Sequence, residues 1–338
     1  MAVMKANAYG HGAAICAQAL HDEADGFAVA FTDEALELRE SNIRKPILVL
    51  EGCFDISELR QAAMQQLSIV IHSNDQVRML ESLDLQPNCM DVWIKIDTGM
   101  HRLGFDPSNV REIHTRMKGC RSVRNVMLMT HFSRADETTS SFTQQQIRRF
   151  DLAAASLGAP TSLSNSAGIL AWPEVNDDCA RAGLIIYGVS PMTSKKHHAV
   201  HEGIHALDPV MTLKSKVIGV QFIPKGEAVG YASGAITRRD SRIGVVAIGY
   251  GDGYPRHAPN GTPVLIDGLP AQLIGRVCMD MLMADLTDLP ASGIGSEVEL
   301  WGKNLDVNII ARHAGTVAHD LLTGVRRVRK RYEPYHDL

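Results

Sequence analysis

The stretch SIVIHSNDQVRMLESLDLQPNCMDVWIKI, residues 68–96, decides the fold class of this chain. It begins with a short apolar run at Ser68–Ile71 and ends with a second one at Val92–Ile96. Between them, Asn74–Leu83 carries apolar residues at helical spacing. A strand, a helix and another strand within about 30 residues form one βα unit of a parallel sheet. The stretch therefore predicts an α/β fold.

The same unit repeats through the first half of the chain. Short apolar runs typical of buried strands begin roughly 20 to 35 residues apart. The other runs are Ala2–Met4, Phe27–Ala30, Ile47–Leu50, Val126–Met129 and Ser162–Ser164. Helical patterns lie between them, with a capped start at Thr32, a stretch at Asp55–Ala63 and a stretch that ends before Gly158. An eighth strand is expected at Asp178–Arg181 or at Leu184–Tyr187. Eight such units predict a (β/α)8 TIM-like barrel over residues 1–207.

The second part of the chain, residues 208–338, has a different rhythm. Its apolar runs are close together and are separated by turn residues such as Asp267-Gly268. The expected strands are Val210–Val220, Ile243–Ile248, Pro263–Ile266, Gln272–Val277 and Glu297–Trp301, and the expected helices are Val307–Ala314 and Ala318–Val328. This pattern predicts a mostly antiparallel β domain after the barrel.

Composition argues against several classes of partner. The 338 residues carry a net charge of −4, which gives no electrostatic footprint for nucleic acid. The sequence has no run of about 18 apolar residues and no secretory signal, so we expect no membrane partner. Six scattered cysteines without a CxxC pair are typical of a reducing compartment, which predicts a cytoplasmic protein. No metal site is expected.

In a parallel barrel, functional side chains gather at the C-terminal ends of the strands. The polar and small residues at these places are Lys5, Arg102, His131, Asn165, Ser166, Arg181 and Gly183. A lysine, a histidine and two arginines at one mouth suit a phosphorylated, carbonyl-bearing cofactor, because a desolvated lysine amine forms a Schiff base with pyridoxal 5'-phosphate. The phosphate is expected at the loops after strands seven and eight, with backbone N–H groups of Ser166 and Gly183 as donors.

Each residue taken singly also has an ordinary structural explanation. A lysine after a strand is most often a surface residue, and Arg102 alone suits an exposed ion pair. His131 suits a core histidine, and Tyr231 suits a side chain that packs on a strand. The local sequences are far more specific than these single residues.

Blocks along nearly the whole chain resemble bacterial alanine racemases, which are pyridoxal-phosphate enzymes of fold type III. The blocks are VMKANAYGHG (3–12), KIDTGMHRLG (95–104), THF (130–132) with ADE (135–137), NSAG (165–168), RAG (181–183) with YG (187–188), GY (230–231), GYGDGYP (249–255) and GRVCMD (275–280). The resemblance implies racemisation of L-alanine and D-alanine, which provides D-alanine for peptidoglycan synthesis or serves alanine catabolism. It also implies a homodimer with shared active sites, each completed by the β domain of the partner.

The resemblance also implies roles for the barrel residues. Lys5 would hold pyridoxal 5'-phosphate through a Schiff base. The phosphate contacts would be Tyr9, Ser166, Gly183 and Leu184. Arg181 would face the pyridine nitrogen, and His131 would link Arg181 to the catalytic tyrosine. Arg102 would bond the phenolic oxygen of the cofactor and help to fix the substrate carboxylate.

Further residues would come from the partner subunit. Tyr231 would act opposite Lys5, with Lys5 handling the proton of the D isomer and Tyr231 that of the L isomer. Met279 and Asp280 would contact the substrate, and Tyr250 would narrow the entrance as a gate.

Lys95 is a candidate for covalent modification. In many members of the family the lysine at this place is carbamylated, and its negative charge positions the active-site arginine, here Arg102. The alternative is an ordinary lysine that pairs with Asp97.

Several alternatives remain at this point. A racemase for serine, or one of broad specificity, would carry the same motifs, because one methyl-sized change in a pocket shifts preference only about 10- to 200-fold. A decarboxylase of related fold would lack the Gly-Tyr and Cys-Met-Asp blocks, and a non-enzymatic pyridoxal-phosphate carrier would lack the β domain that bears Tyr231. A truncated homologue with little activity is a further reading, because relatives carry a helical segment ahead of the lysine strand and this sequence starts almost at Lys5. The tail differs too: residues 321–331 contain no tyrosine, where some members place one near the phosphate.

Overall fold

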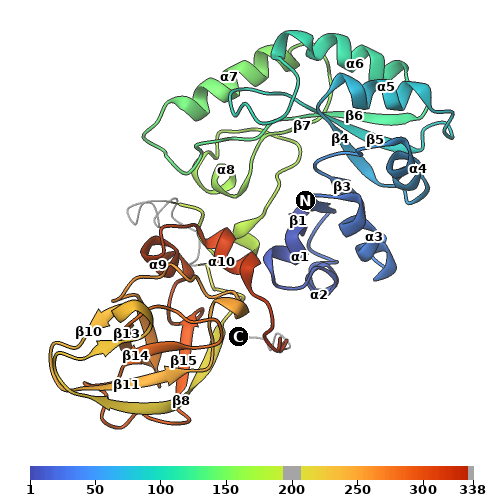
Figure 1. The fold of residues 1–338 in the computed structure, drawn as a ribbon. Coiled ribbons are helices and arrows are strands. Elements are labelled where there is room, and N and C mark those ends of the chain that lie inside the picture. Colours follow the sequence, from blue (N-terminus) through green and yellow to red (C-terminus); the bar gives the residue numbers. More distant parts are fainter. Residues whose placement is uncertain (193–206, 334–338) are drawn as a thin grey trace. The chain divides into compact units, whose positions relative to one another are not determined.

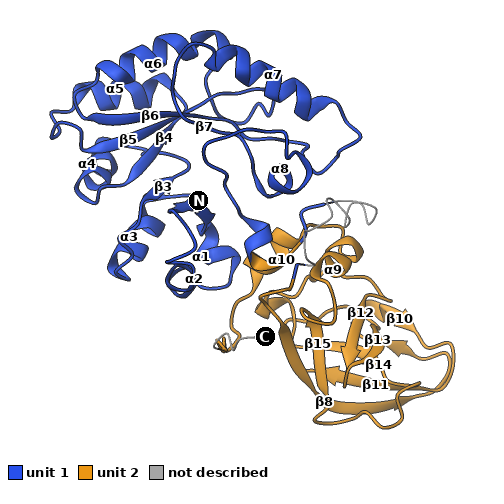
Figure 2. Ribbon diagram, turned by 180° about the vertical axis from the view of Figure 1, so that it is seen from behind, with its two compact units in different colours: residues 1–186, 190–207 blue, residues 187–189, 208–338 orange. Residues whose placement is uncertain are grey.

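The computed structural model describes residues 1–192 and 207–333 of the chain (Figure 1). The chain divides into two units, which Figure 2 shows in different colours. Unit 1 comprises Met1–Ile186 with Ser190–Leu207, and unit 2 comprises Tyr187–Val189 with Asp208–Leu338. Each unit has a sheet of its own, so each is described separately.

Unit 1 contains seven parallel strands that are hydrogen-bonded in chain order. They are β1 (Ala2–Val3), β2 (Phe27–Val29), β3 (Ile47–Val49), β4 (Ser68–Ile71), β5 (Met90–Lys95), β6 (Val123–Met129) and β7 (Thr161–Ser162). Neighbouring strands pair in register, as Phe27 does with Ile47. Strands β2, β3 and β4 are buried along their whole length, which is expected when helices cover the outside of a barrel and side chains fill its inside.

The segment 178–182 closes this sheet into a barrel. On one side, Arg181 N donates to Ser164 O just beyond β7, at 2.9 Å. On the other side, Val3 N in β1 donates to Ala182 O at 2.8 Å. The segment therefore lies between the last strand and the first and takes the place of an eighth strand.

Helices connect the strands of unit 1, and α5, α6 and α7 lie along the outer side of the sheet (Figure 1). The helices are α2 (Ala13–Ala19), α3 (Thr32–Glu40), α4 (Ile56–Met64), α5 (Asn74–Ser82), α6 (Val110–Gly119), α7 (Phe142–Ala154) and α8 (Ser166–Ala171). Side chains cap some of their starts: Asp55 accepts from Glu58 N in α4, and Asn165 accepts from Gly168 N in α8, both at 2.9 Å. Across the described ranges, no helix combines the length and the apolar character that crossing a membrane requires.

Unit 2 is built around a small closed barrel of antiparallel strands. In order around the barrel they are β11 (Ser241–Val246), β14 (Leu282–Asp285), β13 (Leu269–Leu273), β12 (Pro263–Ile266), β15 (Glu297–Trp301) and β8 (Leu213–Ile223). A separate hairpin pairs β9 (Ala228–Val229) with β10 (Ala235–Ile236), and the helices are α9 (Val307–His313) and α10 (Ala318–Gly324). Alternate residues of β12 and β14 are buried, which is the period of a strand with one face on a core. The core includes Trp301 stacked on Tyr254 with ring centroids 5.9 Å apart.

The predicted (β/α)8 barrel followed by a mostly antiparallel β domain is confirmed, with local corrections in unit 1. Asp178–Arg181 occupies the eighth position, whereas the alternative, Leu184–Tyr187, is a 3₁₀ helix. The cap of α3 was placed one residue late, because Phe31 and not Thr32 is the N-cap. The carboxylate of Glu34 reaches back to Phe31 N at 3.3 Å and so fixes the start of the helix.

Unit 2 differs from the expectation at several places. The strand expected at Gln272–Val277 ends at Leu273, because Gly275 has a φ of 79° that does not continue a strand. The last helix ends at Gly324, since Arg326 N turns away to donate to Asp252 O at 2.9 Å. Strands β9, β10 and β14 were not predicted at all.

Candidate active site

Four of the predicted site residues lie at the C-terminal ends of barrel strands. Lys5 follows β1 after Met4, Lys95 is the last residue of β5, and His131 comes shortly after β6. Arg181 lies in the segment that closes the barrel. These groups affect one another electrostatically: Arg181 lowers the pKa values of Lys95 and His131, and Lys5 also lowers that of His131. The fold therefore brings the four side chains together.

The chain makes a left-handed turn, α1 (Lys5–Tyr9), directly after β1. Its residues Ala6, Asn7, Ala8 and Tyr9 have φ values of 51°, 55°, 54° and 50°. This conformation costs a residue other than glycine roughly 1–2 kcal/mol, so four in succession are unusual. A hydrogen bond from Gly10 N to Ala6 O, 3.0 Å long, closes the turn. The turn fixes the backbone that carries Lys5.

The surroundings of Lys5 favour its neutral amine. Burial is the largest influence and lowers the pKa of Lys5. The Glu51 carboxylate opposes that shift, the Arg102 guanidinium adds to it, and the Glu34 carboxylate opposes it. The pKa of Lys5 remains below its ordinary value, which raises the share of the nucleophilic, unprotonated form near neutral pH.

Arg102 lies in the loop after β5, close to the parallel bridge between Ile96 and Phe105. Its side chain is exposed. Its positive charge nevertheless lowers the pKa values of Lys5 and His131, so its guanidinium lies near the cluster.

Lys95 is a buried lysine, with 7% of its surface exposed. Burial, and then the charges of Arg181 and Arg102, lower its pKa to about 8. Asp97 instead receives hydrogen bonds from the backbone of His101 at 3.0 Å and from its Nδ1 at 3.1 Å. Within residues 1–192 and 207–333, Lys95 forms no ion pair with Asp97, although the charge of the Asp97 carboxylate acts to raise the pKa of Lys95 against burial.

Arg181 is a buried cation held by neutral acceptors and is 3% exposed. Its guanidinium donates to Ser162 Oγ and to the carbonyl oxygens of Thr130, at 2.6 Å, and Leu163, at 3.2 Å. No carboxylate among the described residues forms an ion pair with it. Burial lowers the pKa of Arg181 to about 10, although the Asp177 carboxylate opposes the shift. Arg181 therefore remains charged at neutral pH.

His131 is neutral in this setting. Burial lowers its pKa well below the ordinary value, and the nearby cations, first Arg181 and then Lys95, lower it further. Its Nε2 lies 3.5 Å from the Asn165 side-chain nitrogen. Positive charge at this end of the barrel therefore comes from the arginines and lysines and not from His131.

The four predicted phosphate contacts meet where α8 begins. Ser166 Oγ accepts a hydrogen bond from Gly183 N at 2.9 Å. A Cβ on Gly183 would come within 2.8 Å of Tyr9 Oη, so a larger residue there would displace that hydroxyl. Leu184 follows in sequence and is buried. Burial raises the pKa of Tyr9 to about 12, so its hydroxyl stays protonated and can donate.

Three blocks that carry predicted site residues converge within unit 2. Tyr231 begins a 3₁₀ turn between β9 and β10, and its side chain is 71% exposed. A Cβ on Gly230 would lie 3.5 Å from Arg276 N, which places Tyr231 beside the 275–280 block. Tyr250 N donates to Cys278 O at 3.0 Å, so the second tyrosine borders the same block.

Of the other predicted site residues in the 275–280 block, one side chain is exposed and the other is held by an ion pair. Met279 is 52% exposed. Asp280 is paired with Arg327 at 2.7 Å, and Arg327 also pairs with Asp252 at 3.2 Å. Unit 2 thus presents an exposed phenol and an exposed thioether, while Arg327 holds the neighbouring carboxylate.

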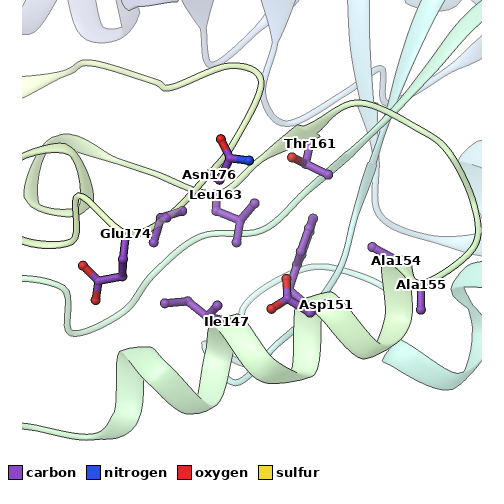
Figure 3. Close-up of a pocket in the computed structure, with 10 residues that line it drawn as sticks. Ile147, Asp151, Ala154, Ala155, Thr161, Leu163, Glu174 and Asn176 are labelled. Carbon is purple, nitrogen blue, oxygen red and sulfur yellow. The ribbon is translucent and has the colours of Figure 1, made fainter.

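A separate cavity of about 330 Å³ lies elsewhere in unit 1 (Figure 3). Helix α7 forms one wall, and the carboxylates of Asp151 and Glu174 lie at the cavity. Its lining residues are Ile147, Phe150, Asp151, Ala154, Ala155, Thr161, Leu163, Glu174, Val175 and Asn176. None of them is a predicted site residue, so this cavity is distinct from the cluster around Lys5.

Comparison with known proteins gives a family for both units. Residues 1–191 match the alanine racemase N-terminal domain, and residues 210–332 match the alanine racemase C-terminal domain. The chain is 50% identical over 332 residues to the alanine racemase of Azoarcus sp. (strain BH72), covering 98% of this chain and 92% of that protein. The chain belongs to the alanine racemase family.

Relatives and solved structures agree with this assignment. A catabolic alanine racemase of Pseudomonas putida (strain KT2440) is 48% identical over 332 residues, with 98% of this chain and 91% of that protein covered. The crystal structure of the biosynthetic alanine racemase from Pseudomonas aeruginosa superposes with a TM-score of 0.93 at 44% identity, covering 99% of this chain and 92% of that one. An alanine racemase from Bartonella henselae with covalently bound pyridoxal phosphate has a TM-score of 0.84 at 28% identity, covering 96% and 89%. The chain is accordingly an isomerase with alanine racemase function.

Sequence reasoning missed several groups that shape this alanine racemase site. Glu34 and Glu51 each come shortly after a barrel strand. The rule that functional side chains follow the strands, which identified Lys5, therefore applies to them as well. Gln146 lies within α7, where nothing in the sequence separates it from a solvent-facing glutamine. Ser162 belongs to a strand, and only the three-dimensional structure shows that it receives Arg181.

Proposed function

We propose that this chain interconverts L-alanine and D-alanine with pyridoxal 5'-phosphate, using Lys5 and Tyr231 as acid and base. The observation that carries the proposal is that Lys5, a lysine of lowered pKa, and the buried Arg181 both lie close enough to His131 to lower its pKa. The family assignment supports it, as does the cofactor bound covalently to the Bartonella henselae relative.

The described residues suit pyridoxal 5'-phosphate at both of its ends. A largely desolvated Lys5 amine is the nucleophile that an aldehyde requires. The Tyr9 and Ser166 hydroxyls and the backbone at Gly183 and Leu184 are polar groups of the kind that hold a phosphate. Lys5 would therefore hold the cofactor covalently, and the other four residues would hold its phosphate.

Racemisation requires two acid/base groups on opposite faces of the α-carbon. When bound, the cofactor would supply an electron sink that makes the α-proton of the amino acid acidic. Lys5 Nζ would take or return the proton on the face of the D isomer, and Tyr231 Oη would do so on the face of the L isomer. A phenol ordinarily titrates near 10, so a tyrosine base needs nearby positive charge. Since His131 is neutral, Arg181 is the source that we propose.

The remaining barrel residues would orient the reactants. Arg181 would donate to the pyridine nitrogen, and His131 would link Arg181 to Tyr231. Arg102 would bond the phenolic oxygen and hold the substrate carboxylate. Its exposed side chain lies close enough to Lys5 to influence the lysine's pKa, which agrees with both roles.

The second acid or base would come from another copy of the chain. We propose a homodimer with shared active sites in which Tyr231, Met279 and Asp280 enter the barrel mouth of the partner and Tyr250 narrows its entrance. The high exposure of Tyr231 and Met279 supports this arrangement, because neither side chain is covered by the described part of the chain that carries it.

Lys95 would be carbamylated. Carbon dioxide reacts with the neutral amine, and a pKa of about 8 makes the neutral fraction near neutral pH far larger than that of an ordinary lysine. The new negative charge would lie among Arg181 and Arg102, where burial otherwise leaves a cation beside other cations.

The reaction would provide D-alanine for peptidoglycan synthesis, or it would serve alanine catabolism. Both biosynthetic and catabolic racemases are among the relatives. We also propose a cytoplasmic location, because all six cysteines are free thiols.

The test measures D-alanine formed from L-alanine by the purified protein with added pyridoxal 5'-phosphate, and L-serine in the same assay. We expect racemisation of alanine and faster turnover of alanine than of serine. Borohydride trapping should place the cofactor on the peptide that contains Lys5. Cofactor on another lysine, or no D-alanine from protein that has taken it up, would contradict the proposal.

A further inference from the structure

The Glu34 carboxylate joins the loops after two neighbouring barrel strands. One oxygen accepts a hydrogen bond from Ala6 N, 2.6 Å away and directly after Lys5. The other accepts from Ala30 N at 2.7 Å and Phe31 N at 3.3 Å, after β2. A single side chain thus binds three backbone donors, one in the loop after β1 and two in the loop after β2.

The loop that Glu34 holds is the left-handed turn. Ala6 is its first left-handed residue, and the next three residues have the same hand. Because each of them costs roughly 1–2 kcal/mol relative to the right-handed region, the turn needs fixed partners to persist. The Asn7 side chain supplies one by accepting from Ala13 N at 2.8 Å. Glu34 supplies another, at the end of the turn that carries Lys5, and the backbone and side chain of His11 contact Ala8 O at the other end.

Helix capping alone does not account for this carboxylate. A glutamate in the first turn of a helix commonly reaches back to the N-cap backbone, and the bond to Phe31 N fits that role. The bond to Ala6 N reaches 28 residues back in the sequence and contributes nothing to the start of α3. Glu58 is the natural comparison: it is equally half-buried at the start of α4, and its carboxylate accepts from Phe54 N at 2.9 Å, four residues away.

We propose that Glu34 is a positioning residue for Lys5: by binding Ala6 N it holds the left-handed turn in the conformation in which the lysine meets the cofactor. The inference rests on the proposed function, since it concerns how Lys5 takes up pyridoxal 5'-phosphate. In that reaction the Lys5 amine attacks the aldehyde carbon, and the carbonyl oxygen leaves as water. If the left-handed turn sampled other conformations, a smaller fraction of molecules would be competent for this reaction.

The charge of Glu34 adds a second, separable signature. The charged groups around Lys5 are Glu51 on the loop after β3, Arg102 on the loop after β5, and Glu34 itself; His131, after β6, is neutral. Of the two carboxylates, Glu34 is the one bonded to the residue next to Lys5. Its removal should therefore lower the pKa of Lys5 further and move the pH dependence of Lys5 reactivity to lower pH.

The experiment compares Glu34→Ala, Glu34→Gln and the control Glu58→Ala with the unaltered protein. Each is stripped of cofactor, titrated with pyridoxal 5'-phosphate by absorbance, and trapped with borohydride to locate the adduct. Loss of a charge-assisted hydrogen bond typically costs enough for about a tenfold change in an equilibrium. We expect uptake at Lys5 to weaken on the order of tenfold or more in both Glu34 variants and less than about twofold in Glu58→Ala. Glu34→Gln retains a single acceptor oxygen and decides the matter if Glu34→Ala does not fold.

A second readout needs no cofactor. The rate at which an amine-acylating reagent labels Lys5 in the apoprotein is followed against pH by peptide mass spectrometry. The midpoint should fall in both Glu34 variants and stay in place in Glu58→Ala. Unchanged uptake and an unchanged midpoint in the Glu34 variants would overturn the positioning role. Failure of the unaltered protein to take up the cofactor at Lys5 would instead refute the proposed function.

Discussion

The charged groups of unit 1 and the reactive groups of unit 2 differ sharply in their exposure. Arg181 and Lys95 in unit 1 are 3% and 7% exposed, whereas Tyr231 and Met279 in unit 2 are 71% and 52% exposed. The barrel thus sets the electrostatics of its own site, because burial and neighbouring charges already shift the pKa values of Lys95, Arg181 and His131. In unit 2, by contrast, the side chains of Tyr231 and Met279 are largely exposed to solvent. Burying the tyrosine is therefore left to whatever surface meets unit 2.

The strongest test of that contrast is Tyr231→Phe. Removing the exposed phenol should leave the unfolding temperature nearly unchanged, because no core contact is lost. Racemisation should fall by about 10²- to 10⁴-fold, which is the usual contribution of a general acid or base. Activity by a coupled D-alanine assay and thermal unfolding are measured on the same samples. Tyr332→Phe, at another exposed tyrosine, is the matched control, and equal activity losses in both variants would remove Tyr231 from the mechanism.

Arg181→Met tests the buried side of the comparison. The substitution leaves the Thr130 and Leu163 carbonyls and the Ser162 hydroxyl without the donor that they share. Buried polar groups that lose their partner cost about 1–3 kcal/mol each, so unit 1 should lose several kcal/mol of its free energy of unfolding. Urea denaturation at fixed protein concentration measures the loss. A variant as stable as the parent would show that water or a rearrangement replaces the guanidinium.

The two units also differ in how well their elements and site residues could be predicted from the sequence. Strand ends in a barrel are predictable from apolar runs, and the residues that follow them include Lys5, His131 and Arg181. Strand β14 was missed because the antiparallel runs of unit 2 are short and closely spaced, with no helix between them to mark their limits. The early end of α10 depends on a bond between Arg326 N and Asp252 O, a contact between residues distant in sequence that no local pattern encodes.

The protonation states of the site residues were harder to predict from the sequence than the identity of those residues. The resemblance implied that His131 links Arg181 to the catalytic tyrosine, but it left the charge of His131 open. Burial, and then the charges of Arg181, Lys95 and other cations, lower the pKa of His131 and keep it neutral, which follows only from knowing that these side chains converge. Glu34 lies just after the helix start that was predicted at Thr32, and its bond to Ala6 N became visible only in the folded chain.

Lys95→Met should change how stability depends on pH. The pKa of Lys95 is about 8 in the folded chain and near 10.5 when it is unfolded. Between these values the unfolded chain binds a proton that the folded chain has released, so this group makes the parent more stable as pH rises through that window, by up to about 3 kcal/mol. Lys95→Met should thus be more stable than the parent at pH 7, and its advantage should shrink toward pH 10. Denaturation in buffers free of carbon dioxide measures this, with Lys225→Met as the exposed control. An advantage that does not vary with pH would contradict the depressed pKa.

Gln146 and Leu152 on α7 bring the comparison of buried and exposed groups down to a single helix. Gln146 is fully buried although polar, and Leu152 is 79% exposed although apolar. The Gln146 amide donates to Thr98 Oγ1 and His131 O, both at 3.1 Å, and accepts from Ser133 N at 3.0 Å. Gln146→Leu should therefore cost about 1–3 kcal/mol, because it leaves buried donors and acceptors unpaired. Leu152→Gln should change the free energy of unfolding by less than about 0.5 kcal/mol. Chemical denaturation of both variants decides between this view and one in which hydrophobicity alone sets the contribution of each α7 residue, since that view predicts the opposite order.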